Sequence, residues 1–312
     1  MSFTIRPFDR DFAGIVPLLN SVNSEPTTAE RLEEAHGNFP TAGLRNRIVA
    51  VDGSGRIIGY SNTVRHPTDK LGKFWIVLVV EHSHRRRGVG ASLLEEAEAW
   101  ARRNGGAEAA ASILDNDPTS IAFAERRGYR IDRHQFESTL NVSTFDESRF
   151  AGVVDGAVAG GIRFFTYAEQ PGDETERQLY DLHRATAIDV PGNDSVDFPP
   201  FDEWRRWLFE GTGKLMDGII IAAEGARIAG VTVLQERGDK GGLYTGYTGV
   251  HRDSRGRKLA LALKLLAVRK AKERKAPYMR TNNDSQNAPM LAVNWKMGYV
   301  KSPGQYTVLK QL

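Results

Sequence analysis

One short segment occurs twice in this chain, each time between an apolar run and a helical pattern. Arg85-Arg86-Arg87-Gly88-Val89-Gly90 follows the run from Trp75 to Val80, and Arg255-Gly256-Arg257-Lys258-Leu259-Ala260 follows the run from Leu243 to Val250. Residue numbers 85 and 255 differ by 170. A strand, a basic turn and a helix start, repeated at a fixed distance, indicate two copies of one αβ fold.

The same offset relates later positions. Asp117 corresponds to Asn287, and Gly128-Tyr129 corresponds to Gly298-Tyr299. A constant offset from the turn to the Gly-Tyr pair means that neither copy carries an insertion there. We therefore predict two domains, 1–150 and 151–312, in a chain long enough for both.

Short alternating runs around glycine turns predict hairpins in both copies. They are followed by a further strand, an amphipathic helix, another strand and a short helix, and a final strand pair is expected to close each copy. The fold class is therefore α/β, with a mixed, mostly antiparallel sheet flanked by helices. Residues 191–200, PGNDSVDFPP, are expected to form an irregular loop.

Composition narrows the class of protein. The net charge is only +3 and there is no cysteine, which removes thiolate nucleophiles and disulfides. No apolar stretch of membrane-spanning length and no signal peptide is found, so we expect a cytoplasmic protein without a membrane partner. The basic stretch 264–275 is interpreted as a solvated helix face; nucleic-acid binding is the less favoured alternative.

The turns have a specific chemistry. A strand that ends in a turn opening a helix directs unpaired N–H groups and the positive end of the helix dipole to one point. Glycine permits close approach, and arginine adds bidentate charge. The turns therefore predict a pyrophosphate site. Neither a P-loop nor a dinucleotide fingerprint is present.

These residues resemble those of the GNAT N-acetyltransferases. Arg85-x-x-Gly88-x-Gly90 matches the family's Gln/Arg-x-x-Gly-x-Gly/Ala signature, and Asn116 to Tyr129 resembles its Asn…Phe-x-x-x-x-Gly-Phe/Tyr helix. The second copy, through Asn287, Asn294 and Gly298-Tyr299, is similar to the C-terminal half of tandem GNAT proteins, mycothiol synthase among them. The resemblance implies two tandem GNAT folds.

The resemblance also implies acetyl-CoA as co-substrate, a primary amine on a small molecule or peptide as acceptor, and direct transfer in a ternary complex without metal. The expected CoA-binding positions are the following: Leu78, Val79, Val80, Arg85, Arg86, Arg87, Gly88, Val89, Gly90, Ala91, Asn116, Ser120, Thr248, Gly249, Val250, Arg255, Gly256, Arg257, Lys258, Leu259, Ala260 and Asn287. Because Lys258 replaces the first signature glycine, we expect the first copy to hold CoA more firmly.

The family's common acid and base are missing. Phe74 and Tyr244 stand at the positions of the usual glutamate, and Ala124 and Asn294 at those of the usual tyrosine. Tyr247 and Tyr244 are candidates for protonating the leaving thiolate, with strand aromatics in a core as the simpler interpretation.

Four acidic or basic residues, Glu81, His82, His84 and Asp189, remain to be interpreted. Glu81 is a candidate base, although a surface acid is the simpler interpretation, and Asp189 is a candidate for meeting a cationic substrate. His82 and His84 are more consistent with solvated turn residues than with a metal site. The missing acid and base motivate an alternative function, a non-catalytic acyl-CoA-binding regulatory protein. Acceptor identity and oligomeric state stay open.

Overall fold

The computed structural model describes residues 2–22, 26–67, 69–192, 198–237 and 241–312. The chain forms two compact units, Met1–Asp132 with Gln305–Leu312, and Arg133–Gly304. The domains predicted at 1–150 and 151–312 follow the sequence repeat. Their bounds remain a prediction. The compact units divide the chain elsewhere, because the last strand of each repeat belongs to the sheet of the other.

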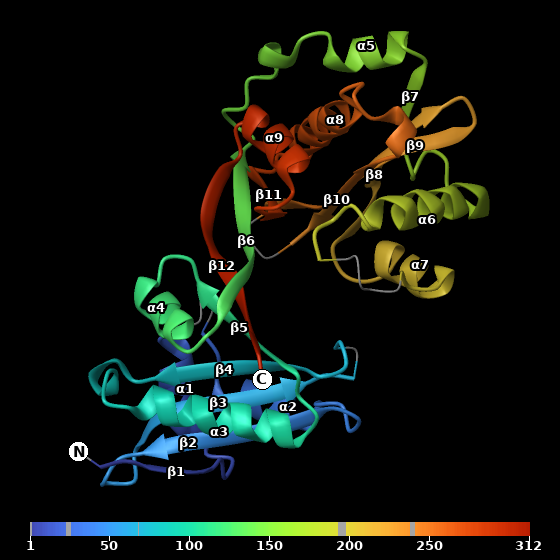
Figure 1. Cartoon of the computed structure of the whole chain (residues 1–312). Helices are drawn as coiled ribbons and strands as arrows, with labels where there is room; N and C mark the ends of the chain where they lie inside the picture. The colour runs from blue at the N-terminus through green and yellow to red at the C-terminus, as the bar shows by residue number, and fades with distance from the viewer. Residues whose placement is uncertain (1, 23–25, 68, 193–197, 238–240) are drawn as a thin grey trace. The chain divides into compact units, whose positions relative to one another are not determined.

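The first unit is built on a mixed sheet of six strands in the order β1-β2-β3-β4-β5-β12 (Figure 1). Neighbours pair antiparallel except β4 and β5, which run parallel. The strand bounds are β1 Thr4–Pro7, β2 Leu44–Val51, β3 Ile57–Arg65, β4 Lys73–Val80, β5 Glu108–Leu114 and β12 Val300–Gln311.

Helices cover both faces of this sheet. The α1–α2 face carries a cluster built around Phe12, Ile15 and Val79, and α3 packs on the opposite face through Val89 and Leu93. The helix bounds are α1 Phe12–Asn20, α2 Ala29–Gly37, α3 Val89–Arg103 and α4 Pro118–Arg126. The helical and strand patterns of the repeat are confirmed here; α2 is an element that the sequence analysis did not name.

The second unit repeats this plan, with strand order β12-β6-β11-β10-β9-β8-β7. Its parallel pair is β10 and β11. The strand bounds are β6 Arg130–Asn141, β7 Ile162–Thr166, β8 Lys214–Glu224, β9 Arg227–Glu236, β10 Leu243–Val250 and β11 Tyr278–Asp284. The mostly antiparallel α/β fold predicted from the sequence is confirmed.

Two aromatic and aliphatic clusters form the core of the second unit. One lies between the sheet, α5 and α8, and the other is built by α6 and α7 around Trp204 and Leu179. The helix bounds are α5 Val153–Ala159, α6 Asp173–Ala187, α7 Phe201–Phe209, α8 Leu259–Glu273 and α9 Ala288–Met297. Residues 193–197 of the predicted loop lie outside the described residues, and α7 begins directly after its last proline.

The closing strands are exchanged between the repeats, so the expected closure of each copy by its own strand pair is wrong. In the first unit Val308 of β12 pairs with Ala111 of β5, and in the second unit Ser138 of β6 pairs with Thr281 of β11. These two pairs are related by the repeat offset. Each exchanged strand therefore occupies the register that the repeat's own strand would have occupied.

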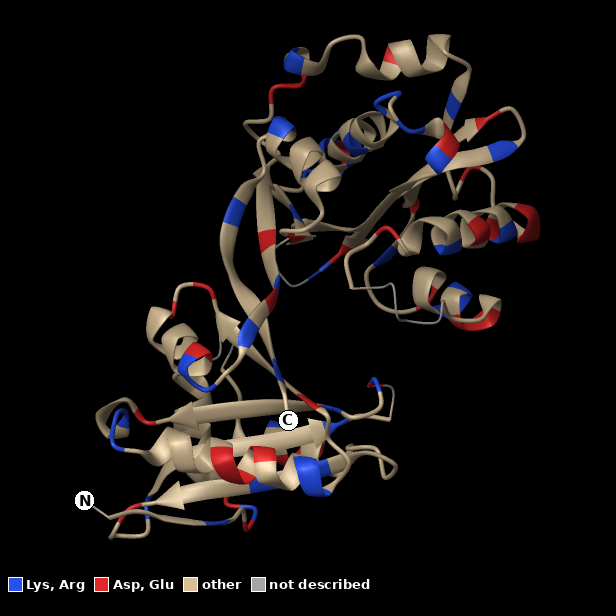
Figure 2. Cartoon of the chain, in the orientation of Figure 1, with Lys and Arg blue, Asp and Glu red and all other residues tan. Residues whose placement is uncertain are grey.

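The helix α8 corrects one sequence interpretation. Lys264, expected on the solvated face, is 2% exposed, and its Nζ lies 5.3 Å from the centre of the Tyr299 ring. The outer cations of this helix pair with acids, for example Arg269 with Glu147. Figure 2 shows basic and acidic residues interleaved along the helices, and this pattern does not favour a nucleic-acid surface. None of the helices within the described residues is long and apolar enough to cross a membrane.

Candidate functional site

The two basic turns share one backbone conformation. Two residues of each turn are left-handed: Arg86 and Gly88 in the first turn, with φ of 59° and 87°, and Gly256 and Lys258 in the second, with φ of 76° and 61°. Each turn thus has one glycine and one non-glycine residue in the left-handed conformation. For the non-glycine residue, Arg86 or Lys258, this conformation costs about 1–2 kcal/mol of free energy. The replacement of Gly88 by Lys258 therefore does not alter the path of the turn.

The second signature glycine is also replaceable. A Cβ added to Gly90 would lie 3.5 Å from Val80 Cγ2 and 3.6 Å from the Phe123 ring, which is ordinary contact. The repeat places Ala260 at this position. The expected weakness of the second turn thus has no basis in its backbone.

The signature arginine stabilises the strand end in both units. Arg85 Nε donates to Val80 O over 3.2 Å, and Arg255 Nε donates to Val250 O over 3.1 Å. Arg255 also donates to Asp189 through Nη2. Arg86, Arg87 and Gly88 are exposed, whereas the side chains of Val89 and Leu259 are buried under the helices, so these two positions offer only their N–H groups.

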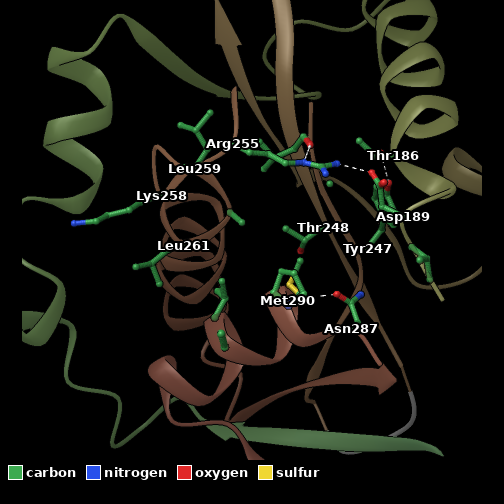
Figure 3. Close-up of a pocket in the computed structure, with 18 of the residues that line it drawn as sticks. Thr186, Asp189, Tyr247, Thr248, Arg255, Lys258, Leu259, Leu261, Asn287 and Met290 are labelled. Atoms are coloured by element: carbon green, nitrogen blue, oxygen red, sulfur yellow. Dashed lines mark hydrogen bonds and ion pairs between the residues drawn. The ribbon is translucent and has the colours of Figure 1, made fainter. Parts of the chain in front are cut away.

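The second unit contains a cavity of about 560 Å³ that reaches from its turn to α9 (Figure 3). This cavity brings together nearly all the CoA-binding positions predicted for the second copy, Arg257 excepted. Its lining residues are Thr186, Asp189, Val190, Tyr247, Thr248, Gly249, Val250, Arg255, Gly256, Lys258, Leu259, Ala260, Leu261, Gln286, Asn287, Pro289, Met290, Ala292, Val293 and Lys296. Arg257 instead pairs with Glu224.

The first unit divides its predicted positions between two cavities. The smaller, of about 270 Å³, is lined by Arg87 and Val89 of the turn. The larger, of about 370 Å³, is differently placed. It lies where β4 and β5 diverge and includes Leu78, Val79 and Ser120 of the predicted positions, but no residue of the turn from 85 to 90. Phe123, in α4, lines it and also contacts the region of Gly90. The equivalent residue in the second unit is the smaller Val293, which leaves the cavity open to the turn. Asn116 is exposed and outside this cavity.

Tyr247 is held in the wall of the larger cavity by a chain of hydrogen bonds. Its hydroxyl bonds to Thr186 Oγ1, and Thr186 Oγ1 donates to Leu182 O over 2.7 Å. Since the threonine proton is used in this way, Tyr247 is the donor to Thr186. A Cβ on Gly249 would lie only 2.7 Å from the Tyr247 hydroxyl, so glycine is required beside it.

The ring of Tyr247 rests on a neutral histidine. The His183 ring stacks on it with centroids 3.9 Å apart, and Trp204 Nε1 donates to His183 Nδ1 over 2.9 Å. Burial lowers the pKa of His183 to about 4 and raises that of Tyr247 to about 12. Both side chains are therefore uncharged at neutral pH, and Tyr247 keeps its proton.

Asp189 bridges two arginines at the same cavity. Its carboxylate accepts from Arg252 over 2.8 Å and from Arg255 over 2.5 Å, and Figure 3 shows the second contact. Burial opposes ionisation, but the two hydrogen bonds outweigh it and lower the pKa of Asp189. Asp189 is thus an anion next to the turn, at the place where a phosphate would also meet Arg255.

The other two catalytic candidates are placed differently. Tyr244 is buried, lies under Arg237 and does not line the cavity. Glu81 accepts from Arg56, Ser83 and His84, and the bond from Arg56 contributes most to lowering its pKa. A carboxylate stabilised in this way is a weak base. Among the described residues no group of three or more metal-ligating side chains is spaced to hold an ion.

A buried polar group lies where β10 and β11 diverge, and the sequence analysis did not anticipate it. Asn294 Nδ2 donates to Asn283 Oδ1 over 2.7 Å, and Asn283 Nδ2 donates to Ser138 Oγ over 2.6 Å. Thr245 Oγ1, Asn294 Oδ1 and Tyr299 OH are buried and have no hydrogen-bond partner within the described part of the chain. Thr186 was likewise missed, because its contact with Tyr247 joins residues 61 apart in sequence.

Comparison with protein families and solved structures matches this geometry. Residues 16–129 match the Acetyltransferase (GNAT) family. The chain has the tandem GNAT fold. The GCN5-related N-acetyltransferase from Sphaerobacter thermophilus has a TM-score of 0.67 at 19% identity, over 99% of this chain and 95% of that one.

A second tandem GNAT protein has a similar fold. The tandem GNAT protein from the clavulanic acid biosynthesis pathway has a TM-score of 0.64 at 20% identity, over 99% of this chain and 98% of the other. No curated protein matches the chain. At these identities the structures establish the shared fold, and the activity of this chain has to be argued from its own residues.

Proposed function

We propose that the second GNAT unit is an N-acetyltransferase site that uses acetyl-CoA and a primary amine in a ternary complex. The observation that carries this proposal is the cavity of about 560 Å³ that joins the turn, the end of β10 and the start of α9. It supports the second unit as the catalytic one. The sequence favoured the first unit for CoA binding and left the catalytic unit open.

The cavity suits a pyrophosphate at the turn. The N–H groups at the start of α8 lack helical partners, and the helix dipole adds positive charge there. Arg255 and Lys296 also line the cavity and supply cationic side chains. Binding of CoA would bring its phosphates into competition with Asp189 for Arg255.

The thioester would lie along the edge of β10 that follows the bulge between Thr245 and Tyr247. The amine nitrogen attacks the thioester carbonyl, the C–N bond forms, the C–S bond breaks, and the amine loses one proton to solvent or a base. Tyr247, whose pKa is raised to about 12 by burial, remains protonated and lines the cavity, and it can protonate the CoA thiolate by turning its hydroxyl away from Thr186. Orientation in the ternary complex supplies the remaining acceleration.

A thiol-release assay tests this function. The full chain is incubated with acetyl-CoA and a panel of small primary amines and peptide N-termini, and free CoA thiol is measured. We expect amine-dependent release for at least one class of acceptor. Tight CoA binding without release on any amine would overturn the catalytic proposal and favour the acyl-CoA-binding regulatory protein.

A further inference from the structure

Two arginines of the first unit converge on one histidine. Arg45 Nη2 and Arg47 Nη1, from β2, each lie 3.0 Å from Nδ1 of His36, near the end of α2. Since a guanidinium only donates, His36 Nδ1 is the acceptor and carries no proton. Burial and the two arginines lower the pKa of His36, in agreement with this assignment. The group thus holds two positive charges and a neutral ring.

These charges have no carboxylate partner among the described residues. Arg45 also donates to the carbonyl of His36 over 3.1 Å, at a helix end that carries about half a negative charge. By contrast, Arg56 pairs with Glu81 and Arg102 pairs with Glu98 in the same unit. Two guanidiniums without an anion indicate a place where an external anion is missing.

Aromatic rings hold both guanidiniums in place. Arg45 lies 4.2 Å from the centre of the Phe39 ring, and Arg47 lies between Phe8 and Phe12 at 5.9 Å and 5.8 Å. Such contacts fix the plane of the guanidinium and so prepare it for bidentate hydrogen bonding. The site is therefore formed before a ligand arrives.

Two buried atoms at this site also lack partners. Arg47 Nε and Asn62 Oδ1 are buried without a hydrogen bond, and Arg47 and Asn62 face each other across β2 and β3. Rotation of the Asn62 amide can present its NH₂ group in place of its oxygen. Buried polar groups are nearly always paired in folded proteins, so the unfilled Arg47 Nε–H donor beside the Asn62 amide marks a binding position.

An apolar wall lies on the same face of the sheet. Asn62 pairs with Val77 of β4 as well as with Arg47 of β2, so the three residues form one row. Val77 is 45% exposed and, together with Trp75, lines the cavity of about 370 Å³. Two strand spacings, about 10 Å, separate the arginines from this wall.

We propose that the first unit binds an amphipathic carboxylate. Its carboxylate lies on Arg45 and Arg47, and its apolar body extends to Trp75 and Val77. An extended chain gains about 1.3 Å per C–C bond, so about eight carbons cover the distance. In the second unit the row equivalent to Arg47, Asn62 and Val77 is Ile219, Val233 and Tyr247, which supplies no cation, so the proposed site belongs to the first unit. The proposal does not depend on acetyl transfer.

Calorimetric titration of the full chain with octanoate tests the proposal. We expect saturable binding, and at least about tenfold weaker binding of octanamide, which lacks the charge. Acetate, which lacks the apolar body, and inorganic phosphate are expected to bind at least about tenfold more weakly than octanoate. Equal binding of octanoate and octanamide, or phosphate binding as tight as that of octanoate, would overturn the proposed ligand class.

Variants locate the site. Arg47→Gln is expected to weaken octanoate binding by about tenfold or more, and Val77→Asn by less. Arg103→Gln, which removes the same charge from an exposed position in the same unit, serves as the matched control and should leave the affinity unchanged. Unaltered binding by folded Arg47→Gln would overturn the proposal. If that variant does not fold, Arg47→Lys replaces it, because lysine keeps the charge but not the planar guanidinium. The comparison of octanoate with octanamide on the native chain then tests the same proposal.

Discussion

The two GNAT units pair their strands in the same register. The side chains between their diverging parallel strands, however, differ in polarity. In the second unit this region is polar, and in the first unit the equivalent positions are mostly apolar. The equivalent pairs, second unit first, are Thr245 and Trp75, Lys264 and Leu94, Thr281 and Ala111, Asn283 and Ile113, Asn294 and Ala124, and Ser138 and Val308. Strand pairing constrains only the backbone, so a duplicated sheet can keep its register while its side chains take on different chemistry.

The tyrosine that both interiors share makes the difference plain. Tyr129 donates to Glu98 over 3.1 Å, and Glu98 in turn accepts from Lys310 of the exchanged strand. Tyr299 has no such partner, because Val268 and Leu140 replace Glu98 and Lys310. The equivalent tyrosine hydroxyl thus belongs to a buried ion-pair network in the first unit and is an unpaired buried polar group in the second.

The sharpest test of this comparison introduces one carboxylate at each turn. Ala260→Asp places a negative charge at the start of α8. The helix dipole stabilises this charge, but the charge repels a pyrophosphate. We expect acetyl-CoA affinity, measured by calorimetry, to fall by about a hundredfold or more. The matched variant Gly90→Asp should change it by less than about twofold. The reverse pattern would place the donor in the first unit.

The buried lysine offers the next largest effect. Burial lowers the pKa of Lys264 from 10.5 to about 8, equivalent to about 3 kcal/mol of unfolding free energy at neutral pH. The folded state binds fewer protons than the unfolded state between these values, so stability should rise as pH increases from about 8 to about 10.5. We expect Lys264→Met to be up to about 3 kcal/mol more stable at pH 7 and to lose this slope.

Urea unfolding at pH 7 and pH 9.5 measures both quantities. Other groups titrate in this range, but they cancel when the variant is compared with the native chain under the same conditions. A variant that is less stable at pH 7 would show that the ammonium group makes a compensating contact.

The exchanged strand should contribute to the first unit through one ion pair. Lys310 Nζ lies 2.8 Å and 2.7 Å from the two oxygens of Glu98, which is 5% exposed. Lys310→Met would leave this carboxylate with Tyr129 and Arg102 only, at a cost of about 2 kcal/mol in urea unfolding. The exposed Lys70→Met is the control, with an expected change below about 0.5 kcal/mol. If Lys310→Met and Lys70→Met change the free energy of unfolding equally, the ion pair between Lys310 and Glu98 does not stabilise the first unit.

The smallest expected effect concerns Tyr247. If its hydroxyl protonates the thiolate, Tyr247→Phe lowers kcat by about tenfold or more and leaves the KM for acetyl-CoA within about twofold. Tyr244→Phe, on the same strand but outside the cavity, should change neither constant. Steady-state kinetics on the best acceptor decide between the two tyrosines, and an unchanged kcat for Tyr247→Phe removes it from the proposed mechanism.

The sequence allowed the fold to be predicted in detail, because periodicity and a constant offset are local signals. Both turns, the parallel strands and the helices after them are found where the pattern places them. The exchange of β6 and β12 could not be predicted, since two equivalent strands fit either sheet with the same register. Lys264 was misplaced because a basic residue on an amphipathic helix is ordinarily exposed.

The candidate site was predictable only in part. The turn residues of the second copy gather at one cavity, but the preference for the first copy rested on Gly88 and Gly90. Sequence identity at those positions could not show that Lys258 takes the same left-handed backbone as Gly88, or that Phe123 separates the turn from the cavity. The hydrogen bond between Thr186 and Tyr247 also depends on tertiary packing, for which the sequence carries no local signal.

The strand exchange has a consequence for synthesis on the ribosome. The edge of β5 in the first unit stays open until residues 305–311 have been made, so this unit cannot finish folding before the whole of the second has been translated. A nascent chain that ends near residue 150 would present an unpaired strand edge to its neighbours. The two halves of this protein therefore mature together, and neither can be produced as a complete domain by cutting the chain once.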